Sequence, residues 1–139
     1  DEPCAGNDCS NHGVCVQPGY CTCSSGWGGE DCSVADQLVV SGTTLDAHLE
    51  TYSWQYYHIV TGAADEGLLV EVTQTSDLGD IDLYLGLNSY PTTHSYIYKD
   101  SSSTSRTMSA QINDVREGTY YVGLYGYCAA DYEIFFSLT

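Results

Sequence analysis

Six cysteines crowd the first 32 residues of this 139-residue chain, and a seventh stands near its end. The six are Cys4, Cys9, Cys15, Cys21, Cys23 and Cys32. Because so short a segment cannot bury an apolar core, disulfides must stabilise it, each by about 2–4 kcal/mol. Clustered cysteines indicate an oxidising compartment, so we expect the protein to be extracellular or at the cell surface. Spacing alone does not choose among the fifteen ways of pairing six cysteines.

Three local marks lie among these cysteines. Ser10-Asn11-His12-Gly13 precedes the third cysteine, Cys21-Thr22-Cys23 forms a close pair, and Gly26-Trp27 precedes the last cysteine. With these marks, residues 1–33 resemble an EGF-like domain of the tenascin and teneurin kind. The resemblance implies three disulfides, Cys4–Cys15, Cys9–Cys21 and Cys23–Cys32.

Some EGF-like domains bind calcium, and the residues that do so are only partly present. Asp1 and Glu2 match the acidic residues ahead of the first cysteine, but Gln17 stands where the calcium-binding subclass has Asn or Asp. Val14 likewise occupies the position of a modified Ser or Thr. We therefore expect a spacer or contact module. A zinc site is disfavoured because the disulfide framework accounts for all six cysteines.

Beyond residue 34 the chain is patterned as short β-strands. In the stretch 79–87, Ile81, Leu83 and Leu85 alternate with Asp80, Asp82 and Tyr84, which predicts a half-buried strand. The other predicted strands cover residues 38–40, 44–49, 53–60, 68–72, 96–98, 107–112, 119–125 and 132–138. These short strands between regular turns predict an all-β fold, a jelly-roll-like antiparallel β-sandwich over residues 34–139.

Several stretches of this second part match one family. They are residues 56–60, 68–72, 79–85, 90–92, 117–127 and 131–134, of which 117–127 is the most specific. On these residues the sandwich resembles the bacterial pre-peptidase C-terminal domain and the collagen-binding domain of clostridial collagenases. The resemblance implies a non-catalytic accessory, solubilising or polymer-binding module of a secreted protein. Several members bind calcium through an acidic segment before the first strand, whereas the EGF-like module occupies that place here.

Charge limits the partners of the chain. Three Lys and Arg face 19 Asp and Glu, a formal net charge of −16. Binding to nucleic acid is excluded and binding to an anionic membrane is disfavoured, because both need a basic surface. No apolar run is long enough to insert into a membrane. The chain opens at Asp1 without a signal peptide, as expected for a mature or excised segment.

The acidity has two readings. It is either a solvated, self-repelling surface or a source of calcium ligands. Asp77, Asp80 and Asp82 are the candidate ligands, and their hard oxygens suit calcium rather than zinc. Otherwise these residues form the solvated face of a strand. No other cofactor is expected.

The chain has 13 Tyr, and several of them are candidates for a ligand-binding face. The candidates are Tyr84, Tyr96, Tyr98, Tyr125 and Tyr127, with Tyr90 nearby. Such a face would stack on sugar rings or grip a fibrous protein. The alternative is ordinary packing of cross-strand pairs.

Cys128 is left over once the other cysteines pair. It is a candidate for an intermolecular disulfide, a buried inert thiol, or a bridge to the EGF-like module. Every Asn lacks the N-x-[ST] context, so any glycans are expected on oxygen. The candidate O-glycan sites are Thr92, Thr93, Ser101, Ser102, Ser103, Thr104 and Ser105, which otherwise form flexible polar loops.

No catalytic constellation is present. The four His are scattered, and no Ser lies in a nucleophile elbow. The sequence therefore predicts a non-enzymatic extracellular structural or adhesion protein, a repeating unit of a surface fibre, appendage or matrix. Its partners would be other copies of itself. The alternative is a secreted accessory module that binds collagen or polysaccharide, with or without calcium.

Overall fold

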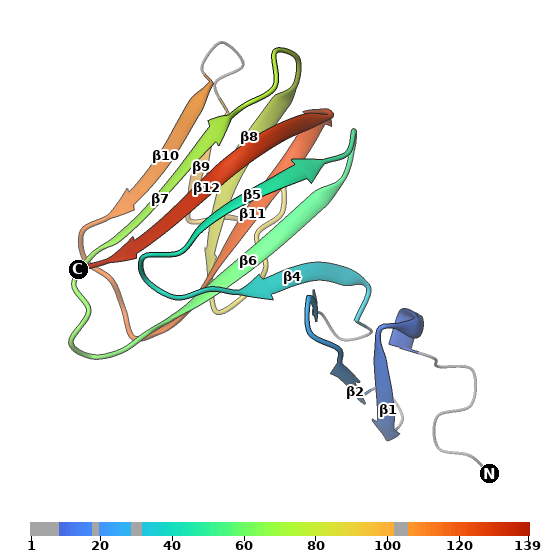
Figure 1. The fold of residues 1–139 in the computed structure, drawn as a ribbon. Helices are drawn as coiled ribbons and strands as arrows, with labels where there is room; N and C mark the ends of the chain where they lie inside the picture. Colours follow the sequence, from blue (N-terminus) through green and yellow to red (C-terminus); the bar gives the residue numbers. More distant parts are fainter. Residues whose placement is uncertain (1–8, 18–19, 29–31, 102–105) are drawn as a thin grey trace. The chain divides into compact units, whose positions relative to one another are not determined.

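The chain divides into two compact units, Asp1–Leu38 and Val39–Thr139 (Figure 1). A computed structural model describes residues 9–17, 20–28, 32–101 and 106–139 of them. Sequence analysis placed the start of the sandwich at residue 34, whereas the strand Val34–Leu38 falls within the first unit.

The first unit is built from short strands. β1 (Gly13–Gln17) and β2 (Tyr20–Cys23) form an antiparallel hairpin. β3 (Trp27–Gly28) pairs with β4 (Val34–Leu38). A 3-10 turn, η1 (Cys9–Asn11), precedes them.

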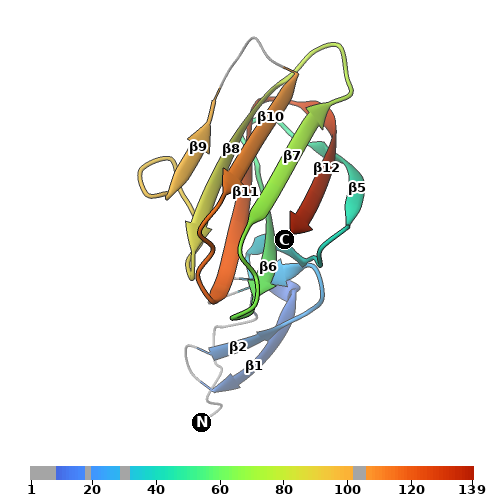
Figure 2. The same ribbon diagram turned by 90° about the vertical axis from the view of Figure 1, so that its left-hand side faces the viewer.

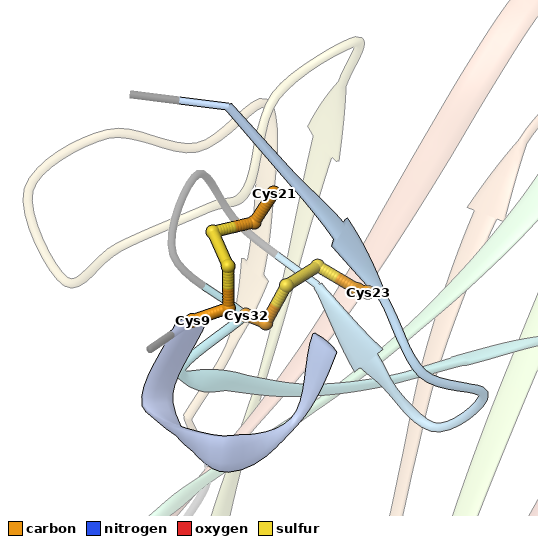
Figure 3. Close-up of a disulfide and its surroundings, with 4 residues drawn as sticks. All are labelled: Cys9, Cys21, Cys23 and Cys32. Carbon is orange, nitrogen blue, oxygen red and sulfur yellow. A yellow bond between two sulfur atoms is a disulfide. The ribbon is translucent and has the colours of Figure 1, made fainter. Parts of the chain in front are cut away.

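Disulfides hold these strands together (Figure 3). Cys9 is bonded to Cys21, and Cys23 to Cys32, which are two of the three pairs that the EGF-like resemblance implies. Cys15 is also disulfide-bonded, while its implied partner Cys4 lies outside the described residues.

The structure explains residues in two of the sequence marks of the EGF-like module. A Cβ atom on Gly13 would lie 2.8 Å from the sulfur of Cys32, so only glycine fits beside that disulfide. The rings of His12 and Trp27 stack at 3.5 Å with an interplanar angle of 3°. This stack supplies apolar contact in a unit with few core residues.

The second unit is a sandwich of two antiparallel sheets (Figures 1 and 2). One sheet has the strand order β10-β7-β12-β5, and the other contains β6-β11-β8-β9. The strands are β5 (Thr44–Leu49), β6 (Trp54–Thr61), β7 (Leu68–Gln74), β8 (Asp80–Leu87), β9 (Tyr98–Asp100), β10 (Thr107–Ile112), β11 (Gly118–Cys128) and β12 (Ala130–Leu138). The predicted all-β fold, with a disulfide-bonded N-terminal module and an antiparallel sandwich, is confirmed.

Most strand ends differ from the prediction by one to three residues, and the predicted strand 38–40 is wrong, because the strand there is Val34–Leu38. β5 and β10 have the predicted bounds, but β9 begins at Tyr98 instead of residue 96. β11 runs three residues past the predicted end, through an irregular register between Gly126 and Cys128. This extension carries Tyr127 and Cys128 to the end of the strand.

The core lies between the two sheets. Ile81, Leu83 and Leu85 of β8 are buried there, on the face that their alternation predicts. The hydroxyl groups of Tyr57 and Tyr132 meet at 2.6 Å inside this core. Burial raises the pKa of both tyrosines. Other large core residues are Ile59, Leu68, Val70, Val72, Met108, Tyr120, Val122, Leu124, Ile134 and Phe136.

Candidate binding face of the sandwich

Aromatic side chains cover the outer face of the sheet that contains β6, β11 and β8. Side chains alternate along β6. Tyr57 and Ile59 point into the core, so Trp54 and Tyr56 point to the outer face of the sheet. The register then brings outer residues together, because Tyr125 pairs with Trp54, and Gly123 with Tyr56.

Five rings form one continuous line, which we call the aromatic row. Successive ring centroids lie 5.5, 5.3, 5.0 and 4.9 Å apart in the order Tyr96, Tyr84, Trp54, Tyr125 and Tyr127. The contacts at both ends are edge-to-face, with interplanar angles of 64° and 85°. Such tilted contacts stabilise aromatic pairs. The row therefore joins β6, β8, β11 and the β8–β9 connection.

A side branch of rings extends from Trp54. The ring centroid of Tyr56 lies 5.2 Å from that of Trp54. Tyr90 follows at 4.8 Å from Tyr56, and Tyr121 at 4.4 Å from Tyr90. His58 adjoins Tyr121 at 5.6 Å. The branch spreads the aromatic layer over a second part of the face.

The β8–β9 connection, residues 88–97, lies against this outer face (Figure 2). Gly86 and Gly123 leave the room that it needs. A Cβ atom on Gly123 would lie 3.1 Å from Pro91, and one on Gly86 would lie 3.2 Å from the same ring. Because of this cover, β8 is buried on both faces and is not the half-buried strand that alternation predicts.

Exposure is greatest at the two ends of the aromatic row. Tyr96 is 45% exposed and Tyr127 is 43% exposed, whereas Tyr84 in the row is 0% exposed. Trp54 and Tyr125 have intermediate exposure. The end rings of the row are therefore open to solvent, whereas Tyr84 is buried beneath its neighbours.

Polar groups adjoin the row at Tyr84. The hydroxyl of Tyr84 is buried without a hydrogen-bond partner among the described residues. The ammonium of Lys99 lies 5.4 Å from the Tyr84 ring centroid. Burial raises the pKa of Tyr84, and the Lys99 charge acts in the opposite direction.

Asp82 points to the same outer face and is only 4% exposed. Burial raises the pKa of its carboxyl group, and the charge of Asp80 adds to the rise. Lys99 lowers this pKa, while Asp100 raises it. The alternative of a solvated strand face is therefore wrong at Asp82, because this residue is buried.

The predicted calcium ligands are not gathered into one tight set. Within the described part of the chain, only the sulfur atoms of Cys9, Cys21 and Cys32 form a group of three candidate ligand atoms within 4.8 Å of one another. These sulfurs belong to disulfides and are unavailable as thiolate ligands. Asp77 instead pairs with Arg106 at 3.4 Å on the surface.

Four of the five predicted ligand-face tyrosines lie in the aromatic row, and Tyr98 does not. Tyr98 packs against the core, and its hydroxyl donates a hydrogen bond to the carbonyl oxygen of Ser109 at 3.0 Å. Sequence analysis missed Trp54, Tyr56 and Tyr121. The shared parity of Trp54, Tyr56 and His58 within their strand was the signal that could have found part of this set.

Cys128 is a free, exposed thiol at the end of β11. The alternative of a buried inert thiol is therefore wrong, because Cys128 follows the register irregularity that ends the strand.

The candidate O-glycan residues fall in two segments. Thr92 is exposed, and its Oγ1 accepts hydrogen bonds from the backbone N–H groups of His94 and Ser95. Ser101 is exposed, while Ser102, Ser103, Thr104 and Ser105 lie outside the described residues.

Comparisons identify the N-terminal module. Residues 4–35 match the model of the teneurin-like EGF domain. Multiple epidermal growth factor-like domains protein 8 of Rattus norvegicus is 52% identical over 35 residues. Disintegrin and metalloproteinase domain-containing protein 11 of Xenopus laevis is 53% identical over 36 residues. These matches cover 25% and 26% of this chain, but only 1% and 8% of the relatives.

Solved structures share the fold of the sandwich. The pre-peptidase C-terminal domain of collagenase from Bacillus anthracis has a TM-score of 0.60 at 16% identity, over 75% of this chain and 96% of that chain. The Yersinia pseudotuberculosis-derived mitogen has a TM-score of 0.52 at 9% identity, over 70% of this chain and 85% of that chain. At these identities the likeness concerns the fold alone.

The two resemblances predicted from the sequence, EGF-like and pre-peptidase C-terminal, are both confirmed. Disulfide-bonded EGF-like modules are typical of extracellular proteins. The described residues contain no helix with the length and apolarity that a membrane span requires.

Proposed function

We propose that this chain is a non-catalytic extracellular adhesion protein whose sandwich binds an extended polymer through the aromatic row. One observation carries this proposal: five rings lie in continuous contact on one sheet face, and both end rings, Tyr96 and Tyr127, are exposed. Tyrosine offers large contact area for little loss of rotamer entropy. The EGF-like module would serve as a spacer beside this binding module.

The charge of the chain narrows the class of polymer. A formal net charge of −16 repels sulfated or carboxylated chains over the range of the Debye length. Neutral polysaccharides and collagen-like proteins remain, and both present apolar faces that pack on aromatic rings.

A pull-down on insoluble collagen, cellulose and chitin tests this function. We expect one of the three to retain the whole chain, and Tyr96→Ala with Tyr127→Ala to abolish retention. Both rings are at exposed positions, and each substitution removes one edge-to-face ring contact, at a cost of about 0.5–1.5 kcal/mol in the free energy of unfolding. The matched control is Phe135→Ala, on the outer face of the other sheet.

Retention that survives the double substitution, or that Phe135→Ala reduces equally, contradicts a role for the row. Each arm is run with calcium and with a chelator, because the sequence predicts calcium ligands at Asp77, Asp80 and Asp82. Retention that requires calcium would support that prediction.

A second candidate function is assembly into a surface fibre or matrix. The exposed, free thiol of Cys128 favours it. Two Cys128 thiols would lose two protons and two electrons to form an intermolecular disulfide, with molecular oxygen or a small disulfide as the acceptor. A head-to-tail contact between copies would extend such pairs into a filament.

Intact mass with and without reductant tests this assembly on native material. A species that halves in mass on reduction, and is absent in Cys128→Ser, would support it. A monomer with one free thiol at high concentration would contradict it.

A further inference from the structure

The buried hydroxyl of Tyr84 has no partner at hydrogen-bond distance among the described residues, and the Lys99 ammonium is the cation that acts on it. Folded proteins pair nearly all buried polar atoms, so an exception calls for an explanation. Tyr84 lies within the aromatic row, between Tyr96 and Trp54. The orphan hydroxyl is therefore part of the face that we propose to bind a polymer.

Asp82 adds a carboxylate on the same face as this hydroxyl. It lies two residues before Tyr84, on the same face of β8, and is nearly buried. The positive charge of Lys99 lowers the pKa of the Asp82 carboxyl group, so these two groups attract each other across the face. A carboxylate with little access to water gains from a hydrogen-bond donor, and such groups are typical of functional sites.

Lys99 completes the set from the neighbouring strand. It pairs with Tyr84 in the register of β8 and β9, and its Nζ lies 5.4 Å from the centroid of the Tyr84 ring. One carboxylate acceptor, one hydroxyl that donates and accepts, and one ammonium donor thus adjoin the row. Two further carboxylates, Asp80 and Asp100, act on the same Asp82 group.

We propose that Asp82, Tyr84 and Lys99 form a polar subsite for the hydroxyl groups of a neutral saccharide bound along the aromatic row. This inference rests on the proposed binding function and names its ligand class.

The hydrogen-bonding capacities of the subsite fit a sugar. Each sugar hydroxyl both donates and accepts, so adjacent hydroxyls satisfy the Asp82 carboxylate, the Tyr84 hydroxyl and the Lys99 ammonium together. The C–H face of the same ring packs against the aromatic side chains. Because a neutral sugar carries no charge, neither the Lys99 ammonium nor the surrounding carboxylates repel it.

Other ligand classes fit less well. A sulfated glycan is repelled by the three carboxylates of Asp80, Asp82 and Asp100 at this subsite. A collagen-like peptide is rich in proline, which has no backbone N–H, so it offers mainly carbonyl acceptors. Such a peptide leaves the Asp82 carboxylate without a donor.

Access to the hydroxyl requires a side chain to move. Tyr96 and Lys99 contact the Tyr84 ring and are themselves exposed. Rotation of exposed side chains takes picoseconds to nanoseconds and needs no backbone change.

Binding of the whole chain to an array of neutral, sialylated and sulfated oligosaccharides, and to a triple-helical Pro-Pro-Gly peptide, tests this inference. We expect binding to neutral members, with the affinity lowered about tenfold in Tyr84→Phe. Asp82→Asn and Lys99→Gln should also weaken it. Tyr52→Phe, which removes the hydroxyl of an exposed tyrosine with no ring contact in the row, is the matched control.

Thermal unfolding separates binding from folding. Tyr84→Phe removes an unpaired buried hydroxyl and keeps the ring, so its unfolding midpoint should equal or exceed that of the wild type. Lower affinity with undiminished stability is the expected signature.

Several results would overturn the inference. These are unchanged neutral-glycan affinity in Tyr84→Phe, binding to sulfated members alone, and no glycan binding at all. Binding to the Pro-Pro-Gly peptide alone, lost with Tyr96→Ala and Tyr127→Ala, would overturn the saccharide assignment and leave the proposed function standing. If, in addition, no polymer retains the chain in the pull-down, both the saccharide assignment and the proposed binding function are contradicted.

Discussion

The hydroxyl of Tyr56 donates a hydrogen bond of 2.8 Å to the carbonyl oxygen of Pro91. This bond ties the β8–β9 connection to β6, a strand 35 residues earlier in the sequence. It is buried, and burial raises the pKa of Tyr56 to about 12. The connection that carries Tyr90 and Tyr96 is thereby fixed on the sheet.

Gly86→Ala should loosen that connection. The added Cβ would meet the carbonyl oxygen of Ser89 and the ring of Pro91, so we expect the free energy of unfolding to fall by about 1–3 kcal/mol. Polymer retention should fall as well, because Tyr90 and Tyr96 are displaced. Urea unfolding measures the first effect and the pull-down measures the second.

The control for this change is Gly62→Ala, whose added Cβ would lie 3.8 Å from Asp65, an ordinary contact. Equal losses in both variants would show that the outer-face contact of Gly86 has no special role.

Tyr132→Phe should destabilise the sandwich. It leaves the buried Tyr57 hydroxyl without its partner, at a cost of about 1–3 kcal/mol. The double change Tyr57→Phe with Tyr132→Phe should cost less, because no hydroxyl is then left unpaired. Urea unfolding of both single variants and the double variant measures this coupling. Strict additivity of the single effects would contradict the hydrogen bond.

Local alternation was enough to predict the core face of β8. Ile81, Leu83 and Leu85 are where a period of two residues places them. The opposite face was not predictable in this way. Its burial depends on Pro91 lying over Gly86 and Gly123, and on pairing among strands far apart in the sequence.

The aromatic row likewise depends on pairing between strands that are far apart in the sequence. Tyr84 and Tyr125 were predicted as ligand-face residues from their type and strand positions, but Trp54 joins them only through the register of β6 with β11. Tyr98 was misplaced because it pairs with the core residue Leu85 of β8, and this register turns its ring toward the core.

Asp82→Asn should stabilise the protein at neutral pH. Burial raises the pKa of the Asp82 carboxyl group above 3.8, so the ionised form at neutral pH opposes folding. This penalty should disappear as the pH falls through the raised pKa toward 3.8. The unfolding midpoints of wild type and variant, measured from neutral to acid pH, should therefore converge.

Asp77→Asn is the control, because Asp77 is exposed and its carboxylate contacts only Arg106 among the interactions of the described chain. A constant difference between Asp82→Asn and wild type at every pH would contradict the linkage.

The imidazole of His48 should titrate above 6.5. Its Nδ1 lies 2.6 Å from a carboxylate oxygen of Asp131, and this hydrogen bond raises the pKa, with Glu50 at 3.2 Å adding to it. The stability from this arrangement is full below 6.5 and is lost as the pH rises through the folded-state pKa. An NMR titration of His48 measures the pKa, and Asp131→Asn should lower it. An unchanged value in that variant would contradict the assignment.

Hydrogen exchange with and without a soluble fragment of the retained polymer tests the central claim most directly. The account predicts slower exchange at residues 88–98 and 120–128, which carry Tyr90, Tyr96, Tyr125 and Tyr127 around the aromatic row. β5 and β10 of the other sheet should be unaffected. Protection confined to that sheet or to the EGF-like module would contradict a binding face built on these rings.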